Sequence, residues 1–213
     1  MSDKLQEITQ AVVDGDAATA EKLTRQALAE GTSAASILRQ ALIPGMDKVG
    51  KLMQDEEYYI PEVLLSARAM KTASDILKPL IQAAGEQESL GRVVIGTVRG
   101  DLHDIGKNLV VMMLEGAGFE VVDLGINISP EQFVDKAVES KADIIGLSAL
   151  LTTTMVGMRD VVDTLKKRGL RDKIKVMIGG APVTKRFADE IGADGYAMEA
   201  ASATEIARKL AKA

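Results

Sequence analysis

The sequence predicts an α/β protein, in which a helical-bundle domain precedes a flavodoxin-like (Rossmann-type), doubly wound, five-stranded parallel sheet. Two observations predict this fold class. In the second part of the chain, short apolar, β-branched segments alternate with segments of helical periodicity, a pattern typical of a parallel sheet covered by helices on both faces. The first part shows helical periodicity only. We therefore expect one domain over residues 1–88 and another over residues 89–213.

The bulk properties exclude several classes of protein. The chain has 213 residues, a formal net charge of −5 at pH 7 and no cysteine. This length suffices for one large or two small domains. The negative charge argues against non-specific nucleic-acid binding, and the absence of cysteine excludes a disulfide framework. No signal peptide and no apolar run of membrane-spanning length is visible, so we expect a cytoplasmic protein that binds neither membrane nor nucleic acid.

The first domain is expected to be a small bundle of helices. Asp16 is a plausible cap for its second helix and Gly31 a plausible terminator. Pro44 and Gly45 are expected to bend or interrupt the third helix, and Pro61 suits the first turn of the last one. Pro79 could kink or end that last helix. The expected helices cover residues 3–13, 17–30, 32–54 and 61–81.

The polar, glycine-bounded segment 83–91 is expected to be the interdomain linker. In the second domain, the expected strands lie near residues 92–98, 119–124, 143–148, 174–179 and 194–197, and the helices near 104–117, 130–140, 153–168, 184–191 and 200–212. If the strand order is 2-1-3-4-5, strands one and three are neighbours at the point where the direction of winding reverses. Ligands bind at this point in such sheets.

The loop after the first strand contains the only histidine of the chain, His103, in the segment Gly100-Asp101-Leu102-His103-Asp104-Ile105-Gly106. Without cysteine, a metal site that takes three or four nitrogen or sulfur ligands from side chains is hard to assemble. A macrocyclic cofactor that brings its own equatorial nitrogens needs only one axial ligand from the protein. Alternatively, Asp101 or Asp104 simply caps the following helix and His103 is exposed. The loop by itself leaves both interpretations open.

Two further loops should reach the same edge of the sheet. The segment from Ser148 to Thr154 follows the third strand, and Gly179-Gly180 follows the fourth. The small residues Gly179 and Gly180 would let a ligand lie close to the backbone. The alternative is that these glycines only form a turn.

Together, Asp101-x-His103-x-x-Gly106, Ser148-x-Leu150 and Gly179-Gly180 resemble the cobalamin-binding signature of corrinoid proteins. These are the corrinoid proteins of methanol, methylamine and methoxyaromatic methyltransferase systems, and they are similar to the cobalamin-binding region of methionine synthase. The resemblance implies a cobalamin bound base-off, with its nucleotide tail inserted into the domain of residues 89–213. It also implies that His103 is the lower axial ligand of cobalt and that Asp101 hydrogen-bonds the far side of its imidazole.

The resemblance implies roles for the other loop residues. Ser148 and Thr152 would hydrogen-bond the nucleotide tail, while Thr154 stands where serine is usual in methionine synthase and keeps the hydroxyl group. The remaining cofactor-binding residues would line the channel of the tail or contact the corrin ring: Gly100, Leu102, Asp104, Gly106, Leu150, Gly179, Gly180 and Ala181.

The domain of residues 1–88 resembles the helical cap that covers the reactive face of the corrin in this family. Met53 and Ile60 stand at the positions of the residues that shield the methyl group, and Met53 replaces an aromatic residue. The alternative is that methionines such as Met53 and Met70 only fill the core of the bundle. A cap that shields the methyl group must move aside, which implies a hinge near residues 83–91.

The resemblance covers nearly the whole chain and implies a methyl carrier, a subunit that is not itself the catalyst. It would be charged as methylcobalamin by a substrate:corrinoid methyltransferase, discharged by a methylcorrinoid:acceptor methyltransferase and reactivated by a reductive activase. Three alternatives fit less well. A cobalamin-dependent sensor or regulatory protein would carry a DNA-binding module, and a mutase subunit would lack the bundle. A cofactor-free signalling domain would need an acidic cluster that Asp101 and Asp104 match only in part.

Overall fold

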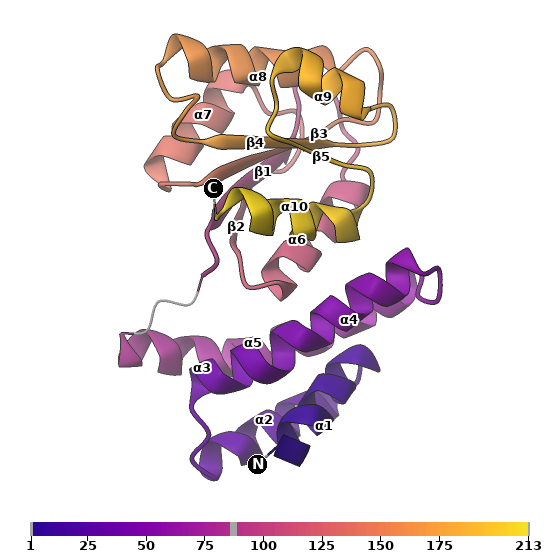
Figure 1. Cartoon of the computed structure of the whole chain (residues 1–213), viewed down its shortest axis with the longest axis vertical. Coiled ribbons are helices and arrows are strands. Elements are labelled where there is room, and N and C mark those ends of the chain that lie inside the picture. The colour runs from indigo at the N-terminus through magenta and orange to yellow at the C-terminus, as the bar shows by residue number, and fades with distance from the viewer. Residues whose placement is uncertain (1, 86–88, 213) are drawn as a thin grey trace. The chain divides into compact units, whose positions relative to one another are not determined.

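The computed structural model describes residues 2–85 and 89–212, which fall into two compact units (Figure 1). The first unit contains the helices of residues 2–85, and the second contains the sheet with its helices in residues 89–115 and 119–212. Of the expected linker, residues 86–88 lie outside the described residues. No helix in the described ranges is both long and apolar enough to cross a bilayer.

The first unit is entirely helical, as predicted. Asp16 caps the second helix, because its carboxylate accepts a hydrogen bond from the Thr19 N–H at 3.0 Å. Ser33 caps the third in the same way, accepting from the Ser36 N–H at 3.2 Å. The helices are α1 (Ser2–Val13), α2 (Ala17–Ala29), α3 (Ala34–Ile37), a π-helical turn η1 (Leu38–Leu42), α4 (Ile43–Gln54) and α5 (Ile60–Ala84).

Pro44 does not interrupt the third helix; instead, η1 joins α3 to α4 without a break. In this π turn the Ile43 N–H bonds to the Leu38 carbonyl, five residues back. The wider turn accommodates a proline, which has no N–H and whose ring crowds the carbonyl of the preceding turn. A Cβ on Gly45 would lie 2.9 Å from the Cβ of Val12, so glycine lets α4 pack closely against α1.

Helix α5 begins with Pro61 in its first turn, as predicted, but Pro79 does not end it. The helix continues to Ala84 and therefore includes the first two residues of the expected linker, Ala83 and Ala84. Gly85 then ends it in the left-handed conformation.

The second unit is a five-stranded parallel sheet in the order β2-β1-β3-β4-β5, which confirms the predicted fold class and topology. Helices cover both faces of the sheet, with α7, α8 and α9 on one face and α6 and α10 on the other (Figure 1). The strands are β1 (Arg92–Thr97), β2 (Glu120–Asp123), β3 (Ile144–Ser148), β4 (Lys175–Gly179) and β5 (Gly195–Ala197). The helices are α6 (Ile105–Gly116), α7 (Pro130–Glu139), α8 (Val156–Lys167), α9 (Lys185–Ile191) and α10 (Ala200–Leu210).

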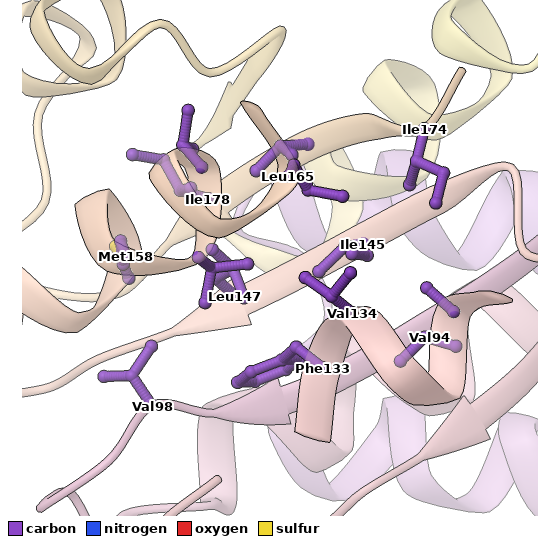
Figure 2. Packing of buried hydrophobic residues seen from close by; sticks show 14 of the residues in the cluster. Val94, Val98, Phe133, Val134, Ile145, Leu147, Met158, Leu165, Ile174 and Ile178 are labelled. Carbon is purple, nitrogen blue, oxygen red and sulfur yellow. The ribbon is translucent and has the colours of Figure 1, made fainter. Parts of the chain in front are cut away.

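One apolar cluster fixes the strands in place (Figure 2). Phe133 of α7 is fully buried between Val94 of β1, Leu147 of β3 and their neighbours, while Met158 begins the stripe of α8 that packs beside it. Burial on both faces explains why the strands form continuous apolar runs in the sequence. This packing holds the carboxyl ends of β1, β3 and β4 in a rigid frame.

Helix α8 begins at Val156, later than the sequence predicted. Residues 152–155 form a turn, in which the Thr154 N–H bonds to the Leu151 carbonyl at 3.1 Å. The segment of three threonines therefore belongs to the loop after β3.

Candidate functional site

Three loops begin side by side at the carboxyl edge of the sheet. In the register of the strands, Thr97 at the end of β1 pairs with Ser148 at the end of β3, and Ser148 pairs with Gly179 at the end of β4. The predicted site residues of the second unit lie on the loops that follow, except for Ser148 and Gly179, which end β3 and β4, and Gly106, which lies in the first turn of α6. The sequence therefore placed the loops after β1 and β3 correctly at the switch point of the sheet, with the loop after β4 on the next strand.

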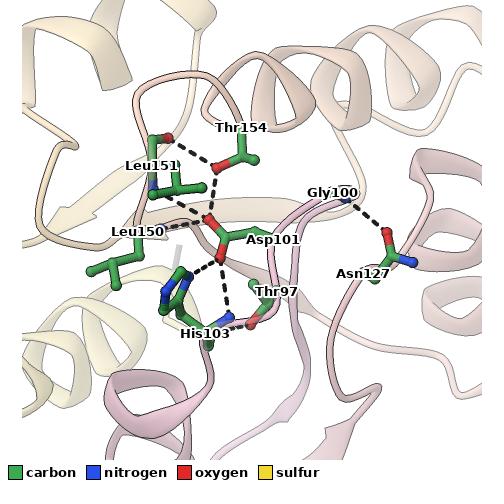
Figure 3. Close-up of polar contacts among 8 residues, drawn as sticks. All are labelled: Thr97, Gly100, Asp101, His103, Asn127, Leu150, Leu151 and Thr154. Carbon is green, nitrogen blue, oxygen red and sulfur yellow. Dashed lines mark hydrogen bonds and ion pairs between the residues drawn. The ribbon is translucent and has the colours of Figure 1, made fainter.

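Asp101 joins the first two of these loops (Figure 3). Its side chain is fully buried. Its Oδ1 accepts a hydrogen bond from the His103 N–H at 3.1 Å and lies 2.7 Å from His103 Nδ1. Its Oδ2 accepts from the N–H groups of Leu150 and Leu151, at 2.8 and 3.3 Å, and from the Thr154 hydroxyl at 2.7 Å. One carboxylate thus connects the loop after β1 to the loop after β3.

This environment keeps Asp101 charged. Burial raises the pKa of the Asp101 carboxyl, but hydrogen bonds from the Thr154 hydroxyl, the Leu150 N–H and His103 lower it by more. The pKa therefore lies well below its ordinary value of 3.8. A charged carboxylate only accepts hydrogen bonds, so Nδ1 of His103 carries the hydrogen, and in the neutral imidazole Nε2 carries the lone pair.

The imidazole of His103 is available to a ligand. Its side chain is 52% exposed, and no described residue forms a hydrogen bond with Nε2. Within residues 2–85 and 89–212, no three histidine, cysteine, aspartate or glutamate side chains form a group that could hold a metal ion. A single imidazole lone pair does not suit a zinc-type site, but it does suit a metal whose other ligands belong to a macrocycle.

Two residues that sequence reasoning missed also hold the loop of His103 (Figure 3). The hydroxyl of the buried Thr97 donates to the His103 carbonyl at 2.9 Å. Asn127, which follows β2, donates its N–H to the Asp101 carbonyl at 3.1 Å and accepts from the Gly100 N–H at 2.8 Å through Oδ1. A hydroxyl in an apolar strand was the only sequence signal for Thr97. The signal for Asn127 was its place in a turn-forming segment.

Lys107, also missed, anchors the start of α6. Its ammonium group lies 2.6 Å from the Asp123 carboxylate at the end of β2 and donates to Oδ1 of Asn108 at 2.7 Å. The lysine side chain is only 1% exposed. A buried cation in the first turn of a helix opposes the helix dipole, so the ion pair with Asp123 is needed to keep it there.

The glycines after β4 are required by the backbone of the protein itself. A Cβ on Gly180 would lie 1.9 Å from the Ala149 carbonyl oxygen, and a Cβ on Gly179 would lie 2.8 Å from that of Ala197. By contrast, a Cβ on Gly106 would meet no atom within 4 Å. Gly179 and Gly180 would therefore be needed with or without a ligand, whereas Gly106 faces open space.

The other predicted residues of the second unit lie on the same three loops. Gly100, Leu102 and Asp104 lie on the loop of His103, and Thr152 lies on the loop after β3, while Ala181 follows Gly180. This edge of the sheet also exposes apolar side chains: Leu102, Ile105, Leu150, Leu151, Val156 and Met198. Such a group of exposed apolar side chains is typical of a surface that a ligand or partner covers.

Met53 and Ile60 lie in the first unit, on either side of the turn between α4 and α5. Ile60 is 45% exposed and Met53 is half-buried, so neither is a core residue of the bundle. Met70, in contrast, is buried, as the core interpretation predicts.

Comparisons with known proteins cover nearly the whole chain. A family model described as the B12 binding domain matches residues 91–207, and a second model of the same description matches residues 4–78. The chain is 45% identical over 208 residues to a corrinoid protein of Desulfitobacterium hafniense, covering 97% of this chain and 96% of the relative. It is also 45% identical over 210 residues to dimethylamine corrinoid protein 2 of Methanosarcina acetivorans, with coverage of 97% and 95%. A solved structure, the methanol:cobalamin methyltransferase complex of Methanosarcina barkeri, matches with a TM-score of 0.87 and 30% identity over 99% of this chain and 80% of the matched chain.

Proposed function

The chain belongs to the B12-binding family of corrinoid proteins, whose cofactor is a cobalamin, and we propose that it carries a methyl group between two methyltransferases. The observation that carries this proposal is the arrangement of His103: Nδ1 is held by a buried carboxylate, and Nε2 is left with a lone pair on a half-exposed side chain. We propose that the cobalamin binds base-off and that Nε2 of His103 is its lower axial ligand.

Each side chain of the site then has a distinct task. When bound, the corrinoid supplies a cobalt centre that accepts a methyl group from one partner and yields it to another. Asp101 holds the hydrogen on Nδ1, which fixes the tautomer and makes Nε2 a better donor. Hydrogen bonds from the Thr154 hydroxyl, the Leu150 N–H and His103 keep Asp101 charged, and the Leu151 N–H also donates to its Oδ2.

The other predicted residues complete the proposal. Ser148 and Thr152 would bind the nucleotide tail, and Gly106 and Leu150 would line its channel. In the first unit, Met53 and Ile60 would shield the methyl group. Residues 1–88 would thus act as the cap and residues 89–213 as the cobalamin-binding domain.

The names of two relatives support the proposed partner that delivers the methyl group. One relative is named a dimethylamine corrinoid protein, and another belongs to a complex with a methanol methyltransferase. We propose that a substrate:corrinoid methyltransferase acting on a small methylated amine or alcohol charges this chain in the cytoplasm. A methylcorrinoid:acceptor methyltransferase would then remove the methyl group, and a reductive activase would reduce cobalt that has become oxidised.

Because the chain contains one histidine, axial ligation can be tested without ambiguity. Protein labelled with ¹⁵N-histidine is reconstituted with hydroxocobalamin and reduced to the paramagnetic Co(II) form. If His103 is the ligand, the hyperfine pattern of the axial nitrogen in the electron paramagnetic resonance spectrum changes from that of ¹⁴N to that of ¹⁵N. An unchanged ¹⁴N pattern would mean that the base of the cofactor still occupies the axial position.

Two variants and a transfer assay complete the test. His103→Ala should fold but lose the axial nitrogen signal and bind hydroxocobalamin more weakly, whereas Lys173→Ala, in an exposed turn before β4, should behave like the parent. The carrier role requires that isotopically labelled methyl groups pass from a methylated amine or alcohol to the protein in the presence of a matching methyltransferase. If no methyltransferase of a panel for methylamines and methanol labels the protein, the carrier proposal fails.

A further inference from the structure

We propose that Asn127 is a positioning residue, which fixes the loop of His103 and so orients the imidazole toward the corrinoid. This inference rests on the proposed role of His103 as the axial ligand. Asn127 lies outside the sequence motifs that define the site, and it would act through Gly100 and Asp101 without touching the cofactor.

The position of Asn127 follows from a bulge in the pairing of the chain after β2. The Thr97 N–H bonds to the Gly125 carbonyl at 2.9 Å, and the Ile128 N–H bonds back to the Thr97 carbonyl at 3.0 Å. Ile126 and Asn127 lie between these two bonds and project from the pairing at the level of the His103 loop. Bulges of this kind redirect side chains beside functional sites.

Asn127 then binds two successive residues of that loop. Its backbone adopts the left-handed conformation, with φ at 57°, which asparagine tolerates better than most residues. Its N–H donates to the Asp101 carbonyl, while its Oδ1 accepts from the Gly100 N–H. The two hydrogen bonds of Asn127 hold Gly100 and Asp101 in place, and we call this pair of bonds the clamp. Figure 3 shows one of them, from the Gly100 N–H to the Asn127 side chain.

The clamp acts at the flexible end of the loop. Gly100 has a φ of 80°, a conformation in which glycine is intrinsically free, so a bond to its N–H restricts it. The next residue, Asp101, holds both the N–H and Nδ1 of His103. Thr97 holds the other side of the histidine through its carbonyl. Without Asn127, the carboxylate that sets the direction of the imidazole would be attached to a less restricted backbone.

Two substitutions separate the side chain of Asn127 from its backbone. Asn127→Gly keeps the left-handed backbone and its N–H but removes the acceptor for Gly100. Asn127→Asp keeps an acceptor oxygen and also tolerates the left-handed conformation. Lys141→Gly is the matched control, because Lys141 is exposed, also has a positive φ, of 54°, and lies at the amino end of β3, away from the site.

The full-length proteins are compared in two measurements. In the apoprotein, amide hydrogen exchange at Gly100 should be faster in Asn127→Gly than in the parent and unchanged in Lys141→Gly. With hydroxocobalamin as the probe, Asn127→Gly should bind about 3- to 10-fold more weakly, the loss expected for one hydrogen bond. A smaller fraction of its bound corrinoid should show axial imidazole in the absorption spectrum. Asn127→Asp should restore both the affinity and the spectrum.

Two outcomes would overturn the inference. If Asn127→Gly exposes the Gly100 amide yet binds hydroxocobalamin with the affinity and spectrum of the parent, the clamp does not position the imidazole. If Asn127→Asp behaves like Asn127→Gly, acceptance from Gly100 is not the reason for the effect. Failure of the proposed function would look different, because the parent protein itself would then show no axial imidazole.

Discussion

Replacing Asp101 by asparagine tests the central contact of the site. The substitution keeps the shape of the side chain but replaces one carboxylate oxygen by an NH₂ group. If the remaining oxygen faces Leu150 and Thr154, the NH₂ group faces the His103 N–H, which is also a donor. The imidazole can relieve half of this conflict by moving its hydrogen from Nδ1 to Nε2. Nε2 then has no lone pair for a metal.

The cost can be worked out from the contacts that are lost. Two hydrogen bonds to a charged acceptor are removed at His103, each worth about 1.5 to 3 kcal/mol, and the change of tautomer recovers part of one. We expect the free energy of unfolding of the apoprotein to fall by about 2 to 4 kcal/mol. Urea unfolding followed by circular dichroism measures this, with Asp104→Asn as the matched control, because Asp104 is only half-buried and its side chain receives one bond, from Asn108.

The pH dependence gives a second, independent readout. Because the pKa of Asp101 is lowered in the folded protein, its stabilising contribution is present above its ordinary pKa of 3.8 and is lost as the pH falls below that value. The difference in stability between the parent and Asp101→Asn should therefore be constant near neutral pH and shrink below pH 3.8. If the two proteins unfold at the same urea concentration, or if their difference is the same at every pH, the reasoning about Asp101 is refuted.

Three further predictions concern neighbouring residues, and urea unfolding of the apoprotein measures each. Thr154→Val removes the hydroxyl that donates to Asp101 and should lower the free energy of unfolding by about 1 to 3 kcal/mol. Thr154→Ser keeps the hydroxyl and should be about as stable as the parent. Equal losses in the two variants would show that the hydroxyl is unimportant. Gly180→Ala should lower the free energy of unfolding by more than about 2 kcal/mol, because the new Cβ would meet the Ala149 carbonyl and the φ is 126°. Gly106→Ala lies in open space on a helix and should raise the free energy of unfolding by about 0.5 to 1 kcal/mol. Changes of the same sign would contradict the geometry. Lys107→Met should cost about 1 to 3 kcal/mol, because it leaves the Asp123 carboxylate without its cation, and a more stable variant would show that the pair only costs desolvation.

The sequence predicted the features that depend on local pattern. Strand and helix periodicity, together with glycines at strand ends, sufficed for the alternation of strands and helices and for the positions of the loops of His103, Ser148 and Gly179, whereas the strand order was assumed from the flavodoxin-like fold and is the order observed. Prediction from the sequence failed where a contact between residues far apart in the chain determines the local structure. Residues 153–155 remain in a loop where the sequence predicted a helix, and the Thr154 hydroxyl of that loop is bound to Asp101. The role of Asn127 depends on a bulge that no local pattern reveals.

Proline was interpreted from local chemistry alone. Pro44 was expected to bend or interrupt its helix and Pro79 to kink or end the last one, yet neither proline ends a helix, because both lie within continuous helical segments.

The π turn η1 also has a consequence for how this chain should be compared with its relatives. A π turn contains one residue more than an α turn, so the segment Leu38–Leu42 behaves as a single-residue insertion absorbed inside an unbroken rod. The insertion sets the rotational phase of α4, and with it the inward direction of Met46 and Val49. A relative that lacks this residue should have a regular α-helix here. An alignment gap at this point would then mark a change of winding with no change in the length of the bundle.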